Sequence, residues 1–464
     1  MSSPSRAERF LLVLTPAVAM TAVAVGLRLG SRGGLRAAVV YAAPMAAGAR
    51  ELAWQVVIFD EDQGMREPVA GLDIDVIARV KDVRAAWRGV TNTDGVAEAG
   101  LAVPGAEGVE LEVRSGANVL ARGSAGPPPP GPPANPRATE PTGWLPFARR
   151  EGPVALDVAA LGQRVAPGVP AELWVRATDA TTHAPLAGVV VALDDDTSLA
   201  VGSGVPAGAR TDSRGWVRVV VTPVGLAVTL TMHARAADAR AGEWIGGLFM
   251  SPGAPSLDVT RRAEPGAAIP VRVTMPTVRS SAYIEIDDAR GRAWAAATPL
   301  TARPDGSSVA EVQAPGLAPG LYWVVGAADP ASASALSSGT LARPFFVAPS
   351  DEAALGLGTD REACAVPRDP REVGSALSSC LALAAVAPSP RWTALDGFVM
   401  QRALDREARE RGRAVALGAL AVAIVLEATL LLRASAGGRA RTVAVAVLVG
   451  LLGFALLAAF IVRV

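Results

Sequence analysis

A stretch that occurs twice constrains the fold of this chain more than any other feature of the sequence. The first copy opens with Pro68-Val69-Ala70-Gly71 and closes at the turn Thr93-Asp94-Gly95. The second opens with Pro185-Leu186-Ala187-Gly188 and closes at Thr211-Asp212-Ser213-Arg214-Gly215. From the proline to the aspartate is 26 residues in the first copy and 27 in the second. Because Asp-Gly turns are typical of tight β connections, the repetition predicts a duplicated β module.

Apolar and polar residues alternate with a period of two around both copies and in a third block, residues 255–348. This pattern is typical of half-buried strands in antiparallel sheets. The alternating apolar positions include Ile74, Val76, Ala78, Val109, Leu111 and Val113 in the first block, Val217, Val219 and Val221 in the second, and Val271, Val273 and Met275 in the third. Strands at intervals of about ten residues with turns between them predict a tandem array of antiparallel β-sandwiches.

Three apolar runs are long enough to cross a bilayer as helices. Residues 10–27 are 18 residues without a charge, and residues 414–432 and 442–462 are runs of 19 and 21 residues. The first run follows Arg6 and Arg9, as in a signal anchor. A shorter apolar run, residues 37–49, comes after it, so cleavage at residue 49 stays open as the alternative. The last two runs predict a helical hairpin.

The arginines predict the orientation in the membrane. The link at residues 433–441 carries three arginines and no acid, which places it in the cytoplasm by the positive-inside rule. The β blocks then lie on the extracytoplasmic side, although five arginines between residues 402 and 413 favour the opposite orientation. Cys364 and Cys380 support export, because two cysteines 16 positions apart predict a disulfide formed in an oxidising compartment.

Together these features predict a mainly β protein with three Ig-like sandwiches and three transmembrane helices. The helix expected over residues 392–413 carries the pairs Asp405–Arg409 and Glu407–Arg411. The expected parts are a signal anchor or transmembrane helix (1–30), sandwich 1 (52–125), a Pro-rich linker (126–151), sandwich 2 (152–252), sandwich 3 (255–348), a Cys-containing segment with a juxtamembrane helix (349–413), and two transmembrane helices (414–432 and 442–462).

Charge and composition exclude several classes of function. Lysine plus arginine and aspartate plus glutamate both number 44, so the sequence has no basic excess of the kind that nucleic-acid binding requires. Lys81 is the only lysine, and no phosphate-binding Gly-rich loop precedes it. His183 and His233 lack the spacing of a zinc site and are expected at the surface. Because no complete catalytic set is visible, we expect no enzymatic activity and identify no small-molecule substrate.

Acidic residues mark two further candidate positions. Asp194, Asp195 and Asp196 follow a strand, and carboxylates that converge on a loop are the oxygen ligands that calcium takes. Acidic residues also occur in loops because their side chains accept hydrogen bonds from backbone amides, so a structural role stays open. Glu427 lies inside the second apolar run, where a carboxyl group is costly and indicates a helix partner, unless it reaches the interface.

The pattern Pro-Leu-Ala-Gly-x-x-Val followed by Thr-Asp-x-x-Gly resembles bacterial Ig-like domains of the invasin type, carboxypeptidase-regulatory-like (transthyretin-like) domains and macroglobulin-type domains. The resemblance covers about residues 52–252, and the matching positions are Pro185, Gly188, Asp212 and Gly215, with Pro68, Gly71, Asp94 and Gly95 around a shorter turn. It implies β-sandwich modules that serve as spacers, adhesive units or accessory domains. The Cys-Gly-Glu-Gln thioester element of macroglobulins is absent.

The function expected from these observations is presentation. A multi-pass protein of the cell membrane would hold its sandwiches outside the cytoplasm and offer loops or sheet edges to another protein or to an envelope component. The alternative is an accessory or sensing subunit of a larger membrane complex, bound through the C-terminal hairpin.

Overall fold

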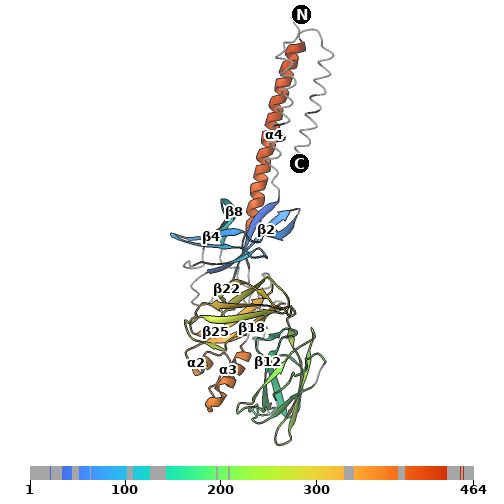
Figure 1. Cartoon of the computed structure of the whole chain (residues 1–464), viewed down its shortest axis with the longest axis vertical. Helices are drawn as coiled ribbons and strands as arrows, with labels where there is room; N and C mark the ends of the chain where they lie inside the picture. The colour runs from blue at the N-terminus through green and yellow to red at the C-terminus, as the bar shows by residue number, and fades with distance from the viewer. Residues whose placement is uncertain are drawn as a thin grey trace. The chain divides into compact units, whose positions relative to one another are not determined.

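The computed structural model describes residues 34–43, 52–62, 64–101, 108–125, 143–194, 197–206, 209–328, 339–384 and 392–435, with single residues at positions 21, 24, 450 and 453. The chain forms two compact units, one of residues 1–38, 59–67 and 396–464 and the other of residues 39–58 and 68–395. Most of the described elements are antiparallel strands, so the predicted mainly β class is confirmed (Figure 1).

The first sandwich contains one four-stranded and one five-stranded sheet. The four-stranded sheet has the order β5-β4-β7-β8, and the other has the order β27-β1-β2-β3 with β6 paired to β2. The strands are β1 (Leu35–Ala42), β2 (Leu52–Asp62), β3 (Met65–Pro68), β4 (Asp73–Val80), β5 (Val83–Val90), β6 (Val96–Leu101), β7 (Val109–Ser115), β8 (Asn118–Ala125) and β27 (Trp392–Asp396). Ile74, Val76, Ala78, Leu111 and Val113 are buried, as their alternation predicts.

Two strands of this sandwich differ from the sequence-based expectation. Residues 35–42, expected in part as an apolar run after the anchor, form β1, in which residues 37–40 are all buried. An apolar run that is buried on both faces has no alternation by which the sequence could identify it as a strand. Residues 392–396, expected as the start of a helix, form β27 in the same sheet. The first sandwich therefore begins before residue 52 and takes a strand from the C-terminal part of the chain.

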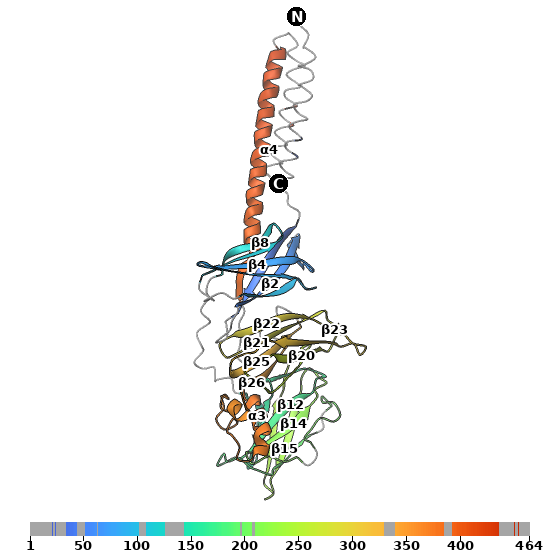
Figure 2. The ribbon, with the colours of Figure 1, turned by 60° about the vertical axis from the view of Figure 1, so that its left-hand side comes forward.

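The second sandwich has sheets of order β10-β12-β14 and β13-β15-β16-β9, with a short parallel pair, β11-β17 (Figure 2). Its core includes Leu156, Leu173, Leu230 and Trp244 from facing strands. The strands are β9 (Phe147–Glu151), β10 (Val154–Ala160), β11 (Arg164–Val165), β12 (Ala171–Asp179), β13 (Val190–Leu193), β14 (Trp216–Val221), β15 (Thr229–Arg235), β16 (Ala241–Gly247) and β17 (Phe249–Met250).

The third sandwich has sheets of order β18-β20-β24-β23 and β19-β26-β25-β21-β22. Ile284, Ile286 and Phe345 are fully buried in its core, and the turn at Pro304-Asp305-Gly306 connects β23 to β24. The strands are β18 (Ser256–Val259), β19 (Arg262–Ala263), β20 (Ile269–Met275), β21 (Ser281–Asp287), β22 (Arg292–Pro299), β23 (Thr301–Ala302), β24 (Ser308–Ala314), β25 (Gly320–Ala327) and β26 (Thr340–Val347).

The Cys-containing segment forms a small helical layer of α2 (Asp351–Leu355), the 3₁₀ turn η2 (Pro370–Glu372) and α3 (Val373–Ala382). Cys364 and Cys380 form the predicted disulfide, with an S–S distance of 1.99 Å. The layer covers the outer face of the β10-β12-β14 sheet and buries Trp174 and Trp216, which alternate along their strands with the core residues Leu173, Val175 and Val217. A sheet that is covered on both faces loses the polar side on which the alternation argument depends.

A 39-residue helix, α4 (Gly397–Ser435), follows β27. Asp396 accepts a hydrogen bond from the Phe398 amide at 2.9 Å, as a residue that caps a helix does. The helix continues through residues 414–432 without a break, and the Asp405–Arg409 ion pair forms at 2.7 Å. Within the part of the chain that the structure describes, no helix combines the length and the apolar character needed to cross a bilayer. The other two expected spans, residues 10–27 and 442–462, lie almost entirely outside the described residues.

Candidate functional site

The two copies of the repeat have the same local hydrogen bonds, and a buried threonine organises each one. In the first copy, the Thr91 hydroxyl accepts from the Leu72 amide at 2.9 Å and donates to the Val69 carbonyl at 2.7 Å. In the second, the Thr211 hydroxyl accepts from the Val189 amide at 2.9 Å and donates to the Leu186 carbonyl at 2.6 Å. Thr91 is therefore the structural equivalent of Thr211, and the sequence match that uses Thr93 is wrong.

The turn that follows each threonine is also the same in both copies. The Asn92 side-chain oxygen accepts from the amides of Asp94 and Val96 at 3.0 and 2.9 Å. The Asp212 carboxylate likewise accepts from the amides of Arg214 and Trp216, two and four residues later, at 3.0 and 2.8 Å. Both side chains can replace a backbone acceptor in such a turn, so asparagine and aspartate are interchangeable here. The first copy has no shorter turn: Asn92 corresponds to Asp212, and Asp94 to Arg214.

Each turn ends in a glycine that the backbone requires. Gly95 has φ of +72° and Gly215 has φ of +82°, in the left-handed region that other residues rarely adopt. A Cβ atom on Gly95 would lie 2.8 Å from the Ile58 carbonyl oxygen, and one on Gly215 would lie 2.5 Å from the Ala177 carbonyl oxygen. The glycine thus allows both the turn and the close approach of the preceding strand.

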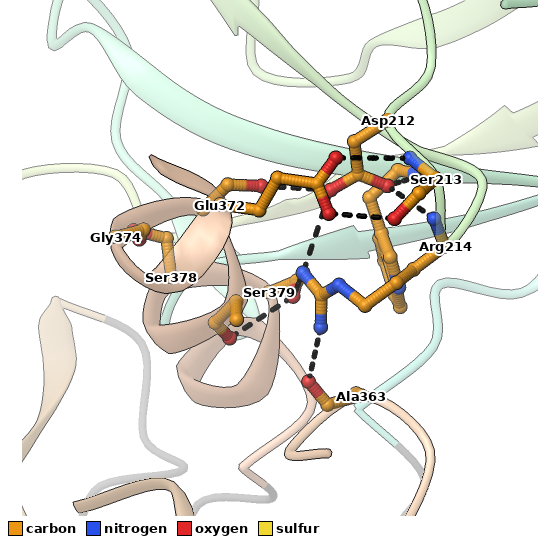
Figure 3. A network of polar contacts seen from close by, with 11 residues as sticks. Asp212, Ser213, Arg214, Ala363, Glu372, Gly374, Ser378 and Ser379 are labelled. Carbon is orange, nitrogen blue, oxygen red and sulfur yellow. Dashed lines mark hydrogen bonds and ion pairs between the residues drawn. The ribbon is translucent and has the colours of Figure 1, made fainter. Parts of the chain in front are cut away.

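In the second sandwich this turn docks onto the helical layer (Figure 3). Glu372 accepts hydrogen bonds from the Ser213 amide at 3.3 Å and the Ser213 hydroxyl at 2.6 Å. The Arg214 guanidinium donates to the Ala363 carbonyl at 2.9 Å and to the Ser379 hydroxyl at 3.2 Å. Because Ala363 and Ser379 neighbour the two bonded cysteines, the disulfide holds both acceptors of Arg214 in place.

Asp212 completes this contact from the other side of the turn. Its second carboxylate oxygen accepts from the Ser375 hydroxyl at 2.9 Å, while the first serves the turn itself. Beneath the turn, the Trp216 ring stacks on Trp144, with ring centroids 5.5 Å apart and planes 3° from parallel. The polar contacts therefore lie at the edge of an apolar contact and fix its orientation.

In the first sandwich the equivalent turn docks onto strand β21 of the third sandwich. The Tyr283 hydroxyl accepts from the Asn92 amide group at 3.1 Å and donates to the Asp94 carboxylate at 2.7 Å. Thr93 donates to the Ser280 hydroxyl at 2.6 Å. Burial raises the pKa of Tyr283, and the Asp94 carboxylate raises it further, so the hydroxyl keeps its proton as a donor. Both repeated turns are thus joints between parts of the protein.

The joint between the first and third sandwiches also contains buried charges. Arg292 lies 2.8 Å from Glu285 and 3.6 Å from Glu98, and all three side chains are almost fully buried. Gln55 donates to the other oxygen of Glu98 at 2.8 Å. One guanidinium thus faces two carboxylates, and removing these three charged groups from the surface is costly.

Asp287 adds a third acid to this buried group. It is 1% exposed, and neither of its carboxylate oxygens has a hydrogen-bond partner among the described residues. Desolvation raises the pKa of Asp287 to about 7, against the opposing effect of Arg292, and Asp288 raises it further. The Asp287 carboxyl therefore titrates near neutral pH.

The other predicted site residues are not brought together. Asp194 has an exposed carboxylate 3.1 Å from Nε2 of His233, which lies on the polar face of β15, while Asp195 and Asp196 lie outside the described residues. Among the described residues no group of three His, Cys, Asp or Glu side chains is arranged to hold a metal ion. The Glu427 backbone belongs to α4, and its side chain is outside the described part.

Several residues of the joints carry no signal in the sequence. Tyr283 reads as one member of an alternating strand, and Glu372 as one more acid in a polar segment. Arg214 occupies a turn position where any exposed residue is acceptable. The one usable signal is the comparison of the two copies of the repeat. The three turn residues differ between the copies, at positions 92–94 and 212–214, and these are the residues that contact different neighbours in the structure.

No model of a protein family and no curated protein matches this chain. Among solved structures it is similar to invasin, a bacterial integrin-binding protein, with 14% identity and a TM-score of 0.16 over 68% of this chain and 60% of that chain. The Escherichia coli adhesin FdeC is 13% identical with a TM-score of 0.17, over 68% of this chain and 96% of that chain. A mutant of Salmonella alpha-2-macroglobulin is 9% identical with a TM-score of 0.17, over 68% of this chain and 23% of that chain. The chain spans less than two thirds of the invasin structure, and likeness at these TM-scores carries no argument about function.

Proposed function

We propose that this chain is a membrane-anchored, extracytoplasmic β-sandwich protein that presents its modules to another protein or to an envelope component without catalysing a reaction. The observation that carries the proposal is the use of both repeated turns as joints. A module that is held at a turn by several hydrogen bonds and a buried apolar contact has a defined orientation, which a presenting scaffold needs.

The second sandwich offers a surface for such a partner in two loops, residues 197–206 and 222–228. Backbone hydrogen bonds tie the loops together, from Val224 to Ser198 and from Ala200 to Thr222, both at 2.8 Å. Val201 is fully exposed, and Leu226 is 69% exposed. Because the two loops contain no charged residue, they favour an uncharged, partly apolar partner surface.

The location rests on the sequence and on the disulfide. A disulfide that closes the helical layer favours an oxidising compartment. The arginines of residues 433–441 favour a cytoplasmic link between the two C-terminal apolar runs, which places the sandwiches on the other side of the membrane.

Topology reporters test the location. Alkaline phosphatase fused after residue 348 should be active, because the enzyme needs an oxidising compartment, and the same reporter inserted at residues 437–438 should be inactive. A reporter that is active only in the cytoplasm should show the reverse pattern. Activity of the cytoplasmic reporter after residue 348 would exclude export of the sandwiches.

Cross-linking in intact cells tests the presenting surface. The double variant Val201→Asp with Leu226→Asp should lose the cross-linked partner of the wild type, because two buried charges are costly in an apolar contact. Val278→Asp is the matched control, since Val278 is 61% exposed in the third sandwich and lies outside the two loops. Equal loss in the control, or no loss in the double variant, would contradict the proposed surface.

The alternative, an accessory subunit of a membrane complex, is favoured by one observation on α4. Val415, Val422 and Val425 are all more than half exposed along this helix, which suits a bilayer or a partner helix. Replacing Glu427 with Leu should weaken assembly if the helix binds a partner there. Unchanged assembly, together with loss of binding in the loop variant, would favour presentation over the accessory role.

A further inference from the structure

One face of strand β21 points away from the core of the third sandwich and is nevertheless buried. Ile284 and Ile286 of this strand belong to the core. Because side chains alternate along a strand, Tyr283, Glu285 and Asp287 lie on the opposite face, and each of them is 1% exposed. The outer face of an antiparallel sheet is commonly solvated, so the burial of these polar side chains depends on parts of the chain outside the third sandwich.

The first sandwich provides part of this cover. The Tyr283 hydroxyl bonds to the side chains of Asn92 and Asp94 in the turn of the first sandwich. Arg292, in the neighbouring strand β22, lies 3.6 Å from Glu98 of β6. The polar groups of this face therefore stay out of water only while the first sandwich is docked.

Asp287 is the acid of this face that the contact leaves without a partner. Its register neighbours are Arg292 in β22 and Trp323 in β25. The Arg292 guanidinium lies 2.8 Å from Glu285 and 3.6 Å from Glu98. In the described part of the chain neither carboxylate oxygen of Asp287 accepts a hydrogen bond, and Nε1 of Trp323 has no acceptor either. A buried carboxylate without hydrogen bonds is costly, so this position favours the protonated carboxyl group.

Ionisation of Asp287 therefore opposes the docking of the first sandwich. Burial raises the pKa of Asp287 from its ordinary value of 3.8 to about 7, Arg292 opposes the rise, and Asp288 adds to it. The docked state thus binds the proton more strongly than a state in which water reaches the carboxyl group. The ratio of docked to released chains should fall about thirtyfold between about pH 5.5 and about pH 8.5.

We propose that protonation of Asp287 switches the contact between the first and third sandwiches: the first sandwich is held when this carboxyl group is neutral and is released when it is ionised. Release lets water reach the carboxylate and frees the turn at residues 92–95 for another contact. The switch does not depend on the proposed membrane anchoring, because all of its residues lie in the β modules.

Distances between spin labels on the purified full chain in detergent test the switch. Val83→Cys with Glu311→Cys places one label on the first sandwich and one on the third, both at exposed positions. Cys364 and Cys380 are bonded to each other, so only the introduced thiols react. The distance distribution should be narrow at about pH 5.5 and broad at about pH 8.5. Val201→Cys with Glu311→Cys spans the second and third sandwiches instead and should keep its distribution.

Variants of single acids identify the group that titrates. Asp287→Asn should give a narrow distribution at both pH values, because an amide of the same size does not ionise. Asp258→Asn, which removes an exposed acid of the same sandwich, should respond like the wild type. If Asp287→Asn does not fold, as judged by circular dichroism, Asp287→Ala replaces it. The proposal is overturned if the wild-type distribution does not change with pH, if the Asp287 variant responds like the wild type, or if both label pairs broaden together.

Discussion

The turn at residues 92–95 and the turn at residues 212–215 have the same backbone hydrogen bonds, yet they hold different neighbours. The first contacts a strand of the third sandwich through Tyr283, beside a group of buried acids. The second contacts a helical layer closed by a disulfide, through Arg214 and Glu372. The backbone pattern determines the turn, and the three residues within it determine what the turn binds.

The two joints should therefore respond to different conditions. The first joint contains Asp287, whose carboxyl is buried and lacks a hydrogen-bond partner among the described residues, so its strength depends on pH. The second depends on Cys364 and Cys380, which hold the acceptors of Arg214, so its strength depends on the redox state. Variants that act on only one joint test this difference.

The largest effect is expected from Asp287. Its pKa is about 7 in the folded chain against an ordinary value of 3.8, so the folded state keeps the proton longer than the unfolded state. The stabilisation is complete below about pH 4 and is lost as the pH rises through about 7, by up to about 1.4 kcal/mol per pH unit. Asp287→Asn should remove this dependence, measured as hydrogen exchange of β21 and of residues 92–95 against pH.

Glu311→Gln is the control for this experiment, because it removes a carboxyl that is 73% exposed in the same sandwich. It should keep the pH dependence of the wild type. A pH profile of the Asp287→Asn chain that matches the wild type would show that another group controls the first joint.

Loss of the disulfide should act on the second joint. The double variant Cys364→Ser with Cys380→Ser opens a loop whose ends are 16 residues apart in sequence, which costs about 3 kcal/mol by the chain-entropy estimate. Hydrogen exchange should become faster in α3 and at residues 212–215 but not at residues 92–95. Addition of a reductant to the wild type should reproduce this pattern, and equal acceleration at both turns would contradict independent joints.

The turn glycines should affect both joints, the second more strongly. Gly215→Ala and Gly95→Ala each place a side chain at positive φ, which costs about 1 to 3 kcal/mol. The Gly215 variant should lose stability at the upper end of this range. Its Cβ would lie 2.5 Å from a carbonyl oxygen, compared with 2.8 Å for the Cβ of the Gly95 variant. Denaturant unfolding measures both.

Gly116→Ala serves as the reference for these two variants. Gly116 has φ of +57° and open space around the position of a Cβ atom, so its substitution reports the backbone strain alone. If Gly215→Ala were no more destabilising than Gly116→Ala, the close approach of Ala177 would have no energetic consequence.

The smallest effect is expected from Tyr283→Phe, which removes a hydroxyl that bonds to Asn92 and Asp94. The loss should be about 1 kcal/mol, seen as faster exchange at residues 92–95. Tyr322→Phe removes a comparable hydroxyl, bonded to Ala318 at 3.1 Å within the third sandwich, and should leave the turn unchanged. Faster exchange of α3 in the Tyr283 variant would mean that the joints are coupled.

Local patterns predicted much of the fold. Alternation identified the strands around Val76 and Val273, because the core face of each is buried and the other face carries polar or charged side chains. The bond between Cys364 and Cys380 followed from a count of two cysteines. The Pro-x-Ala-Gly and Asp-Gly elements marked both repeats, although the register of the first turn was off by two residues because asparagine can replace aspartate there.

Prediction failed where an element is covered on both sides. β1 has no polar face, and β27 pairs with β1, a strand more than 300 positions away in the sequence. Trp174 and Trp216 are buried by a helical layer that the periodicity of their strands does not predict. Neither joint could be inferred either, since Arg214 and Tyr283 acquire partners only when distant segments meet.

The sequence by itself thus determined the β modules, their turns and the disulfide. The modules and turns depend on side-chain period and backbone dihedral preference, which act over a few residues, and the disulfide follows from the number of cysteines in the whole sequence. Only the tertiary structure decided that the two turns are joints and that Asp287 is buried without a hydrogen-bond partner among the described residues. Burial and charge compensation depend on which surfaces come together, and that is a property of the packed chain.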